Sequence, residues 1–548
     1  MTPPSVGSDN DNDIDIDIDI DTVIVGNGPS SMILSYILHG HLPYYSADTP
    51  HPDSLLHAKL KDSPCLLRPD LDALTCHFGA SLLSYSTQAL PINVLLDTLL
   101  RPQGEVDDLG EVTNLQWHYK PHRAVPHIVV GNAPQPGGLW AMDDPIHISW
   151  DIGTLSYAGM LSLPGYTFAD HYRNTTGNEL AAFTRPSRRE LADYLRAYPA
   201  QAGIADSFRD KTMVDGIHRV PGGFYIPSHR IRCKHLVLAS GIFSHLIQPP
   251  PLLAPLLTLP KSDPSCRYPL LVVGSGFTAA DAIISAPSGQ PILHTFLWNP
   301  NVRPSPLKSC HQQAYPEYAG IYRLMKRAAL SSSSSRAGSR PKARRLASTS
   351  FLESRNWDDI YEGLPNCVVE DVQLKEDHAI VTLALEDGTK LSRPVCGLVY
   401  GVGRRGALDY LDSSLRAEVL RDANHSDDGM ISAKTLRTKV MEDLEVAPDV
   451  FVIGSLTGDS LIRFAYGGCV YAAYSLISAS GGCSGICTPK QPAGTPTGGR
   501  HALMNGVDGH TAARRPKLKT TVSFGNDCQE SLVPRKSSWW NTICSLLF

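Results

Sequence analysis

Two short glycine-rich segments constrain this chain more than any other feature, because each one follows an apolar strand and opens an apolar helix. Gly26-Asn27-Gly28 comes directly after the run at 22–25, and Gly274-Ser275-Gly276 comes after the run at 270–273. In such a turn the first glycine permits the sharp bend. The second lets the backbone approach a pyrophosphate at the positive end of the following helix. One such segment is a weak signal, but two in one chain predict an α/β fold with two Rossmann-like dinucleotide-binding domains.

Both turns keep a small residue at the third position of the pattern, where the helix must pack closely against the strand. That position is Ser31 in the first turn and Ala279 in the second. The residues of both turns are therefore candidate cofactor-binding residues. They are Gly26, Asn27, Gly28, Pro29, Ser30 and Ser31 in the first turn, and Gly274, Ser275, Gly276, Phe277, Thr278 and Ala279 in the second.

The charge and the cysteine content of the chain indicate which partners and which cellular compartment to expect. The 548 residues include 49 Lys and Arg against 54 Asp and Glu, so the formal net charge of −5 gives no general attraction to nucleic acid. Twelve cysteines in a chain of this length do not form a disulfide framework, and the Asp-rich N-terminus is unlike a secretory signal. No group of His and Cys residues has the spacing of a zinc site. We expect a cytoplasmic, reducing setting, no metal and no nucleic-acid partner.

Low-complexity segments flank and interrupt the globular part. Residues 1–20 are an acidic extension that ends in an Asp-Ile repeat, and ordered structure is expected from Thr22. Residues 331–350 are a Ser- and Arg-rich loop, and residues 481–548 are a flexible tail. The tail closes on an apolar segment with two tryptophans next to Arg and Lys. This end is either a docked or disordered terminus or a weak anchor at a membrane surface.

Further motifs resemble those of flavoproteins with two dinucleotide-binding domains, in particular flavin-containing monooxygenases. Gly137-Gly138-Leu139-Trp140 resembles the Gly-Gly-x-Trp element that follows the second strand of the FAD domain, a strand expected here at 127–130. The string from Val237 to Gly241 resembles the segment that links the two domains. The string from Gly454 to Asp459 resembles the segment that returns to the flavin.

The oxidative stress-induced growth inhibitor family, which shares this two-nucleotide layout, resembles the chain more closely still. The matching strings are spread from residue 23 to about 476 and leave out both tails. They are Val25-Gly26-Asn27-Gly28-Pro29-Ser30, Leu55 to Leu60, Leu96 to Leu100, Pro126 to Trp140, Gly274-Ser275-Gly276 with Thr278 to Ala282, Tyr315-Pro316-Glu317-Tyr318, and Gly458-Asp459 with Arg463-Phe464 and Gly467-Gly468.

The resemblance implies an FAD-binding domain in two parts, residues 21–260 and 396–480, with an NAD(P)H-binding domain inserted at 261–395. It implies an FAD-dependent, NAD(P)H-consuming oxidoreductase. We expect a monooxygenase that acts on a small molecule with molecular oxygen, through a flavin hydroperoxide. A non-catalytic or regulatory nucleotide-binding protein that retains the flavoprotein fold is the alternative.

The resemblance also adds residues to the candidate FAD site. Asp459 is expected to bind the ribityl chain, and the helix that begins near Arg463 is expected to point its positive end at the flavin pyrimidine. A surface ion pair at the start of a helix is the other interpretation of these two residues. The remaining additions are Gly137, Gly138, Leu139 and Trp140.

The chain departs from the monooxygenase pattern at positions that recognise the nucleotides. Gly131 stands where an acidic residue would bind the adenosine ribose, and Asp48 is a substitute by spacing alone. The strand expected at 292–296 is not followed by the arginines that bind a 2′-phosphate in relatives. The nearest cations are Arg303 and Lys308, so the choice between NADPH and NADH stays open. The sequence names no catalytic residue, because the active-site asparagine and the Phe-x-Gly-x-x-x-His signature of the monooxygenases are absent.

Overall fold

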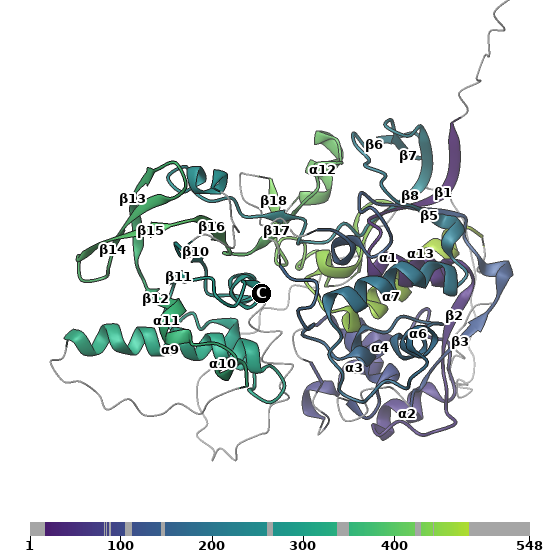
Figure 1. The fold of residues 1–548 in the computed structure, drawn as a ribbon. Helices are drawn as coiled ribbons and strands as arrows, with labels where there is room; N and C mark the ends of the chain where they lie inside the picture. Colours follow the sequence, from purple (N-terminus) through teal and green to yellow (C-terminus); the bar gives the residue numbers. More distant parts are fainter. Residues whose placement is uncertain are drawn as a thin grey trace, which may run out of the picture.

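The computed structural model describes residues 17–481, with gaps at 82, 84, 87–88, 105–111, 144–147, 260–266, 337–349, 422, 424–428 and 442. The C-terminal tail with its two tryptophans lies outside the described residues, as does most of the Ser- and Arg-rich loop. Figure 1 shows the described chain as two lobes, and the teal and green segment from β10 to β16 forms the smaller one. We call the larger part the first lobe and the smaller part the second lobe.

The first lobe is built on a parallel sheet with β1 (Ile18–Val25) near its centre. The strand order is β5-β4-β1-β8-β20, all parallel, and β19 pairs antiparallel at the far edge. A hairpin of β6 and β7 extends antiparallel from β8. The strand expected at 127–130 is therefore confirmed as β4, next to β1. The bounds are β4 (His127–Val130), β5 (Phe208–Arg209), β6 (His218–Val220), β7 (Gly223–Ile226), β8 (Ile231–Leu238), β19 (Glu445–Ala447) and β20 (Val450–Val452).

The first strand begins four residues earlier than expected, at Ile18 rather than Thr22, so part of the acidic Asp-Ile repeat belongs to the sheet. Cations near the start of the neighbouring strand β8 neutralise the repeat. Asp17 pairs with Arg230 at 3.1 Å and Arg232 at 3.2 Å, and Asp21 pairs with Lys234 at 3.3 Å. Charge density alone therefore placed the strand boundary too late.

The second lobe has its own parallel sheet, in the order β12-β11-β10-β16. Its two faces are covered differently. Val272 of β10 packs in a cluster with residues of α8 and α9, whereas Leu271 packs in a cluster with residues of an antiparallel sheet, β13-β14-β15. The bounds are α8 (Phe277–Ser285), α9 (Pro316–Arg336), β10 (Leu270–Val273), β11 (Ile292–Phe296), β12 (Tyr361–Pro365), β13 (Val368–Leu374), β14 (Ala379–Ala384), β15 (Lys390–Val395) and β16 (Gly397–Tyr400).

Two parallel α/β sheets, each with a strand that runs through a glycine turn into a helix, confirm the predicted fold class. The helix α9 continues to Arg336, so the first residues of the expected Ser- and Arg-rich loop are helical. Within the described residues, no helix is long and apolar enough to cross a membrane.

The segment between β1 and β4 carries α1 and a long insertion that packs against the first lobe. Helix α1 contacts α13, the last described helix, and α13 also contacts α4 of the insertion. The bounds are α1 (Pro29–Leu38), β2 (His41–Tyr45), α2 (Ser54–Leu60), α3 (Leu71–Thr75), α4 (Pro91–Leu100), β3 (Leu115–Tyr119) and α13 (Tyr466–Ala479). The remaining elements are α5 (Ala158–Leu161), α6 (Phe168–Thr176), α7 (Arg188–Gln201), β9 (His245–Leu246), α10 (Ser350–Glu353), α11 (Trp357–Ile360), β17 (Arg404–Ala407), α12 (Ser413–Leu420) and β18 (Met430–Ile431), with short 3₁₀ turns between them.

Candidate functional site

The two glycines of the first turn have different surroundings. The fold requires a glycine at Gly26, whereas Gly28 faces open space. Gly26 has a φ of +120°, and a Cβ there would lie 2.4 Å from the carbonyl oxygen of Ala239. Gly28 has extended backbone, and a Cβ there would have no atom within 4 Å. Gly28 also precedes α1, whose N-terminus has no side-chain cap, so backbone N–H groups stay available to an anion.

The second turn repeats this division. Gly274 has a φ of +142°, and a Cβ there would lie 2.3 Å from the carbonyl oxygen of Gly401. The nearest atom to a Cβ on Gly276 would be Cγ of Pro306, at 3.9 Å, and α8 likewise begins without a side-chain cap. Ala279 packs against Gly401, where an added Cβ would lie 2.9 Å from the Ala279 backbone. In both turns, protein packing does not explain the second glycine, whereas a bound pyrophosphate would.

The other residues of the two turns hold the turns in place. Pro29 is the first residue of α1, and Ser31 is fully buried with a hydroxyl that has no partner among the described residues. Ser30 lies against Gly454, where a Cβ would be 2.3 Å from its hydroxyl oxygen. In the second turn the carbonyl of Ser275 accepts a hydrogen bond from Ser305 at 2.6 Å, the ring of Phe277 meets that of Tyr318 edge-on, and Thr278 is half-buried.

The segment 137–140 packs directly on the first turn. The backbone N–H of Gly137 donates to the carbonyl of Asn27 at 2.9 Å, and a Cβ on Gly138 would lie 3.0 Å from Cα of Gly28. Leu139 is partly exposed and Trp140 is half-buried against the core. The structure therefore brings the Gly-Gly-x-Trp element to the place where the first glycine turn faces open space.

Asn27 explains the missing acidic residue at position 131. Its buried side chain lies where a Gly131 side chain would begin, because a Cβ there would be 2.3 Å from Asn27 Cγ. The Asn27 amide donates to Asp210 Oδ1 at 2.7 Å and to the carbonyls of Ala133 and Gln135. Asp210 follows β5, so it brings a carboxylate to the same edge of the sheet. Burial raises the pKa of Asp210, and the hydrogen bond from Asn27 opposes that shift.

The sequence did not single out Asp210, because β5 has only two residues and gives no strand pattern. Asp48, the substitute chosen by spacing, lies in the inserted segment instead. Its carboxylate accepts hydrogen bonds from Ser46 at 2.9 Å and from Gln116 at 3.2 Å. Spacing from the first turn was misleading because the residues after α1 enter an insertion rather than the next parallel strand.

Asp459 is buried where α4 packs against residues 454–468, which we call the return segment. One of its oxygens accepts hydrogen bonds from the N–H of Leu90 at 2.8 Å and from the Asn93 amide at 2.6 Å. The other oxygen pairs with Arg437 at 2.7 Å. The N-terminus of α13 is covered as well, since Asn93 accepts from the N–H of Gly468 at 2.8 Å.

Arg463 is buried too, and it pairs with Asp97 of α4 at 2.6 Å. Asp459 and Arg463 are therefore not a surface ion pair, because both are buried and both join α4 to the return segment. The flavin contacts expected of them stay a prediction. Ser455 lies in the 3₁₀ turn that follows β20, and its hydroxyl oxygen accepts a hydrogen bond from the N–H of Ile242 at 3.2 Å.

His294 stabilises the second turn through a hydrogen bond to its first glycine. It lies in β11 with 1% exposure, and its Nε2 donates to the carbonyl of Gly274 at 2.7 Å. Its Nδ1 lies 2.8 Å from the Tyr361 hydroxyl. Burial lowers the pKa of His294 to about 4, so the ring is neutral at pH 7. No sequence pattern marks His294 as functional, because a lone histidine in a buried strand belongs to no motif.

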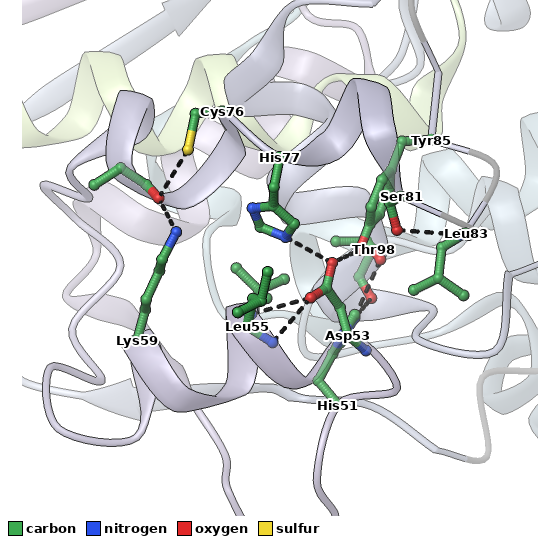
Figure 2. A network of polar contacts seen from close by, with 12 residues as sticks. His51, Asp53, Leu55, Lys59, Cys76, His77, Ser81, Leu83, Tyr85 and Thr98 are labelled. Carbon is green, nitrogen blue, oxygen red and sulfur yellow. Dashed lines mark hydrogen bonds and ion pairs between the residues drawn. The ribbon is translucent and has the colours of Figure 1, made fainter.

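A second polar cluster lies within the insertion, away from the glycine turns. Figure 2 shows Asp53 at its centre, accepting hydrogen bonds from His77 at 2.8 Å and from Tyr85 at 2.7 Å. Asp53 also caps the N-terminus of α2, and the adjacent His51 reaches Thr98 of α4 at 3.1 Å. Although burial would raise it, the pKa of Asp53 is held below its usual value by these donors. The cluster therefore ties α2 to α4 within the insertion.

Comparison with known proteins gives relatives of this arrangement. No family model matches the chain. The chain is 27% identical over 498 residues to oxidative stress-induced growth inhibitor 1 of Mus musculus, covering 83% of this chain and 94% of that protein. It is 27% identical over 362 residues to oxidative stress-induced growth inhibitor 2 of Homo sapiens, covering 55% of this chain and 68% of that protein. The resemblance to this family that the motifs predict is therefore confirmed.

Two solved structures also align with the chain. A flavin-containing monooxygenase from Stenotrophomonas maltophilia aligns with a TM-score of 0.46 at 11% identity, covering 84% of this chain and 99% of that one. A bacillithiol disulfide reductase from Staphylococcus aureus aligns with a TM-score of 0.44 at 10% identity, with the same coverage.

Proposed function

We propose that this protein is an FAD-dependent, NAD(P)H-consuming oxidoreductase that oxidises a small molecule with molecular oxygen, as a monooxygenase does. FAD would bind at the first glycine turn and the nicotinamide nucleotide at the second. When bound, FAD accepts a hydride from the nicotinamide and, once reduced, reacts with oxygen. The protein's own contribution is to hold the two nucleotides in place and to exclude water.

The observation that carries this proposal is the space at the second glycine of each turn. Gly26 and Gly274 are glycines because the neighbouring strand leaves no room for a Cβ, whereas Gly28 and Gly276 face open space at an uncapped helix N-terminus. A pyrophosphate needs both features, namely close approach of the backbone and unpaired N–H groups. Their repetition in two sheets supports a pair of dinucleotides over a single one.

The residues around the first turn suggest how FAD would be held. The backbone N–H groups at the start of α1 would bind the pyrophosphate, and the 137–140 segment would close over it. Asp210, held by Asn27, is the carboxylate that we assign to the adenosine ribose in place of an acidic residue at Gly131. Its half-buried position and raised pKa suit a carboxyl group that gains a hydrogen-bonding partner on binding.

The arrangement of α4 bears on the alternative, a nucleotide-binding protein without turnover. Asp459 and the N-terminus of α13, the expected contacts of the flavin ring system, are both engaged by α4. If α4 keeps this position when a nucleotide binds, this observation favours a nucleotide-binding protein without turnover.

The visible spectrum of the purified full-length protein, followed by anaerobic addition of NADPH or NADH, separates the two. We expect a flavin band near about 450 nm that bleaches on addition of one of the nucleotides. The bleached sample, mixed with oxygen and candidate small molecules, should then yield an oxygenated product. A band that neither nucleotide bleaches supports the non-catalytic alternative. A colourless protein that takes up no added FAD contradicts the assignment of FAD to the first turn under both candidate functions.

A further inference from the structure

Arg185, in the loop before α7, connects the two lobes through its guanidinium group. Within its own lobe it donates to the carbonyl oxygens of Thr154 at 2.6 Å and Gly153 at 3.2 Å. Across to the second lobe it donates to the carbonyl of Ala314 at 2.8 Å and to the carboxylate of Glu317 at 2.7 Å. One side chain therefore holds backbone of the first lobe against the start of α9.

Tyr315 makes a second crossing next to the first. Its hydroxyl donates to the carbonyl of Leu155 in the first lobe at 2.8 Å. Its ring lies under the Arg185 guanidinium, with the central carbon 4.6 Å from the ring centre. Tyr315 is 3% exposed, and the side chains of Arg185 and Glu317 are 13% and 16% exposed. These charges are paired away from water, where charge-assisted hydrogen bonds are strongest.

The same turn of α9 is also tied to the second glycine turn. Tyr318 donates its hydroxyl hydrogen to Asp281 of α8 at 2.8 Å, and α8 begins directly after Gly276. The four residues Tyr315-Pro316-Glu317-Tyr318, one of the strings by which the sequence resembles the family, thus make contacts in two directions. Tyr315 and Glu317 contact the first lobe, and Tyr318 contacts the helix that opens at the nicotinamide site.

We propose that Arg185, Glu317 and Tyr315 form an interlobe latch that fixes one orientation of the two lobes. The part of this inference that concerns catalysis rests on the proposed function. Hydride transfer between two bound nucleotides requires their reacting atoms to approach within about 3–3.5 Å, so a change in lobe orientation would slow it steeply. The three side chains are positioning residues, since none of them lies at either glycine turn.

The latch is tested with Arg185→Met and Tyr315→Phe in the full-length protein. Arg196→Met is the matched control, because Arg196 forms an exposed ion pair with Asp193 inside the first lobe and outside both measured segments. Amide hydrogen exchange is measured in segments 150–158 and 312–320 without added nicotinamide. We expect exchange in both segments to rise at least about tenfold for Arg185→Met and less for Tyr315→Phe, with no change for the control.

Three further measurements on the same variants separate orientation from binding. We expect FAD occupancy and the Kd of the nicotinamide nucleotide to be unchanged, while the rate of anaerobic flavin reduction falls at least about tenfold for Arg185→Met. Arg185→Lys should recover only part of the rate, because an ammonium group cannot span four acceptors as the planar guanidinium does.

Unchanged exchange in both variants would overturn the latch. Faster amide exchange together with an unchanged rate of flavin reduction would overturn the positioning role of the latch. If Arg185→Met does not fold, Tyr315→Phe decides, because it removes one hydroxyl and keeps the ring. If neither nucleotide reduces the flavin of the unaltered protein, the proposed function fails, and the exchange result still decides whether the latch exists.

Discussion

Arg463 and Asp97 lie 366 residues apart in the sequence and form a two-pronged ion pair in the core of the first lobe. Nε of the arginine is 3.1 Å from Oδ1 of the carboxylate, and Nη2 is 2.6 Å from Oδ2. Arg101, which directly follows α4, donates to the same carboxylate. Although burial would raise the pKa of Asp97, the two guanidinium groups outweigh it and hold that pKa below its usual value. The pair joins the insertion to the return segment.

Asp97→Asn should destabilise the protein strongly, because it leaves two buried guanidinium groups without their counter-charge. We expect the free energy of unfolding at pH 7 to fall by about 3–5 kcal/mol, measured by urea denaturation. Arg416→Met is the control, since it removes an exposed ion pair with Asp409 and should cost less than about 1 kcal/mol. Equal losses in the two variants would show that the buried pair does not hold α4 in place.

The sequence predicted those elements that a local sequence pattern specifies. A β-branched run that stops at glycine and continues into an apolar helix identified the β1 and β10 turns. The Gly-Gly-x-Trp element follows β4, as its resemblance to the flavoprotein motif predicted.

The sequence could not predict contacts between residues far apart in the chain. The Asn27 amide explains Gly131 only once the fold brings the two together, and Asp210 joins them from a strand too short to recognise. Asp459 lies in the string that resembles the flavin-returning segment, yet its oxygens are engaged by α4, an element of an insertion that no local pattern positions. Arg185 likewise has no motif, since its partners lie in the other lobe.

Gly28→Ala should abolish FAD binding and leave the fold intact. The backbone of Gly28 suits any residue and its Cβ would meet no protein atom, so the methyl group can clash only with what binds there. We expect flavin absorbance to be lost while the urea midpoint of the flavin-free protein matches that of the unaltered apoprotein. Gly26→Ala is the contrast, because its Cβ would strike the Ala239 carbonyl and should unfold the protein. Full flavin occupancy in Gly28→Ala would refute this placement of FAD.

Gly276→Ala should separate the two nucleotides. A Cβ there would have its nearest atom, Pro306 Cγ, at 3.9 Å, so the fold tolerates it. We expect full FAD occupancy together with a Kd for the nicotinamide nucleotide weakened at least about tenfold, measured by anaerobic titration of the flavin band. A titration identical to that of the unaltered protein would place the nicotinamide elsewhere.

Arg303 should select NADPH over NADH if the second turn takes a 2′-phosphate. Its side chain is exposed in the loop after β11. The backbone N–H of Arg303 donates to the Asn299 carbonyl at 2.9 Å, and Lys308 is exposed five residues further along. Arg303→Ala should raise the KM for NADPH by about tenfold and leave the KM for NADH unchanged, because only the former carries the phosphate. Equal changes for both nucleotides would exclude a phosphate contact.

His294 should make stability fall as the pH drops below about 6.5. Burial lowers its pKa from 6.5 to about 4, so the folded protein keeps the ring neutral while the unfolded chain takes up a proton. The stability from this difference is therefore complete above pH 6.5. It is lost progressively down to pH 4, about 3 kcal/mol in total. His294→Gln removes the titration, so its unfolding free energy should fall less steeply over that range, by up to about 1.4 kcal/mol per pH unit. His127, whose pKa is also lowered to about 4, titrates equally in both proteins and cancels in the comparison. Parallel curves from urea denaturation at pH 4 to 7 would show that His294 is not held neutral against the Gly274 carbonyl.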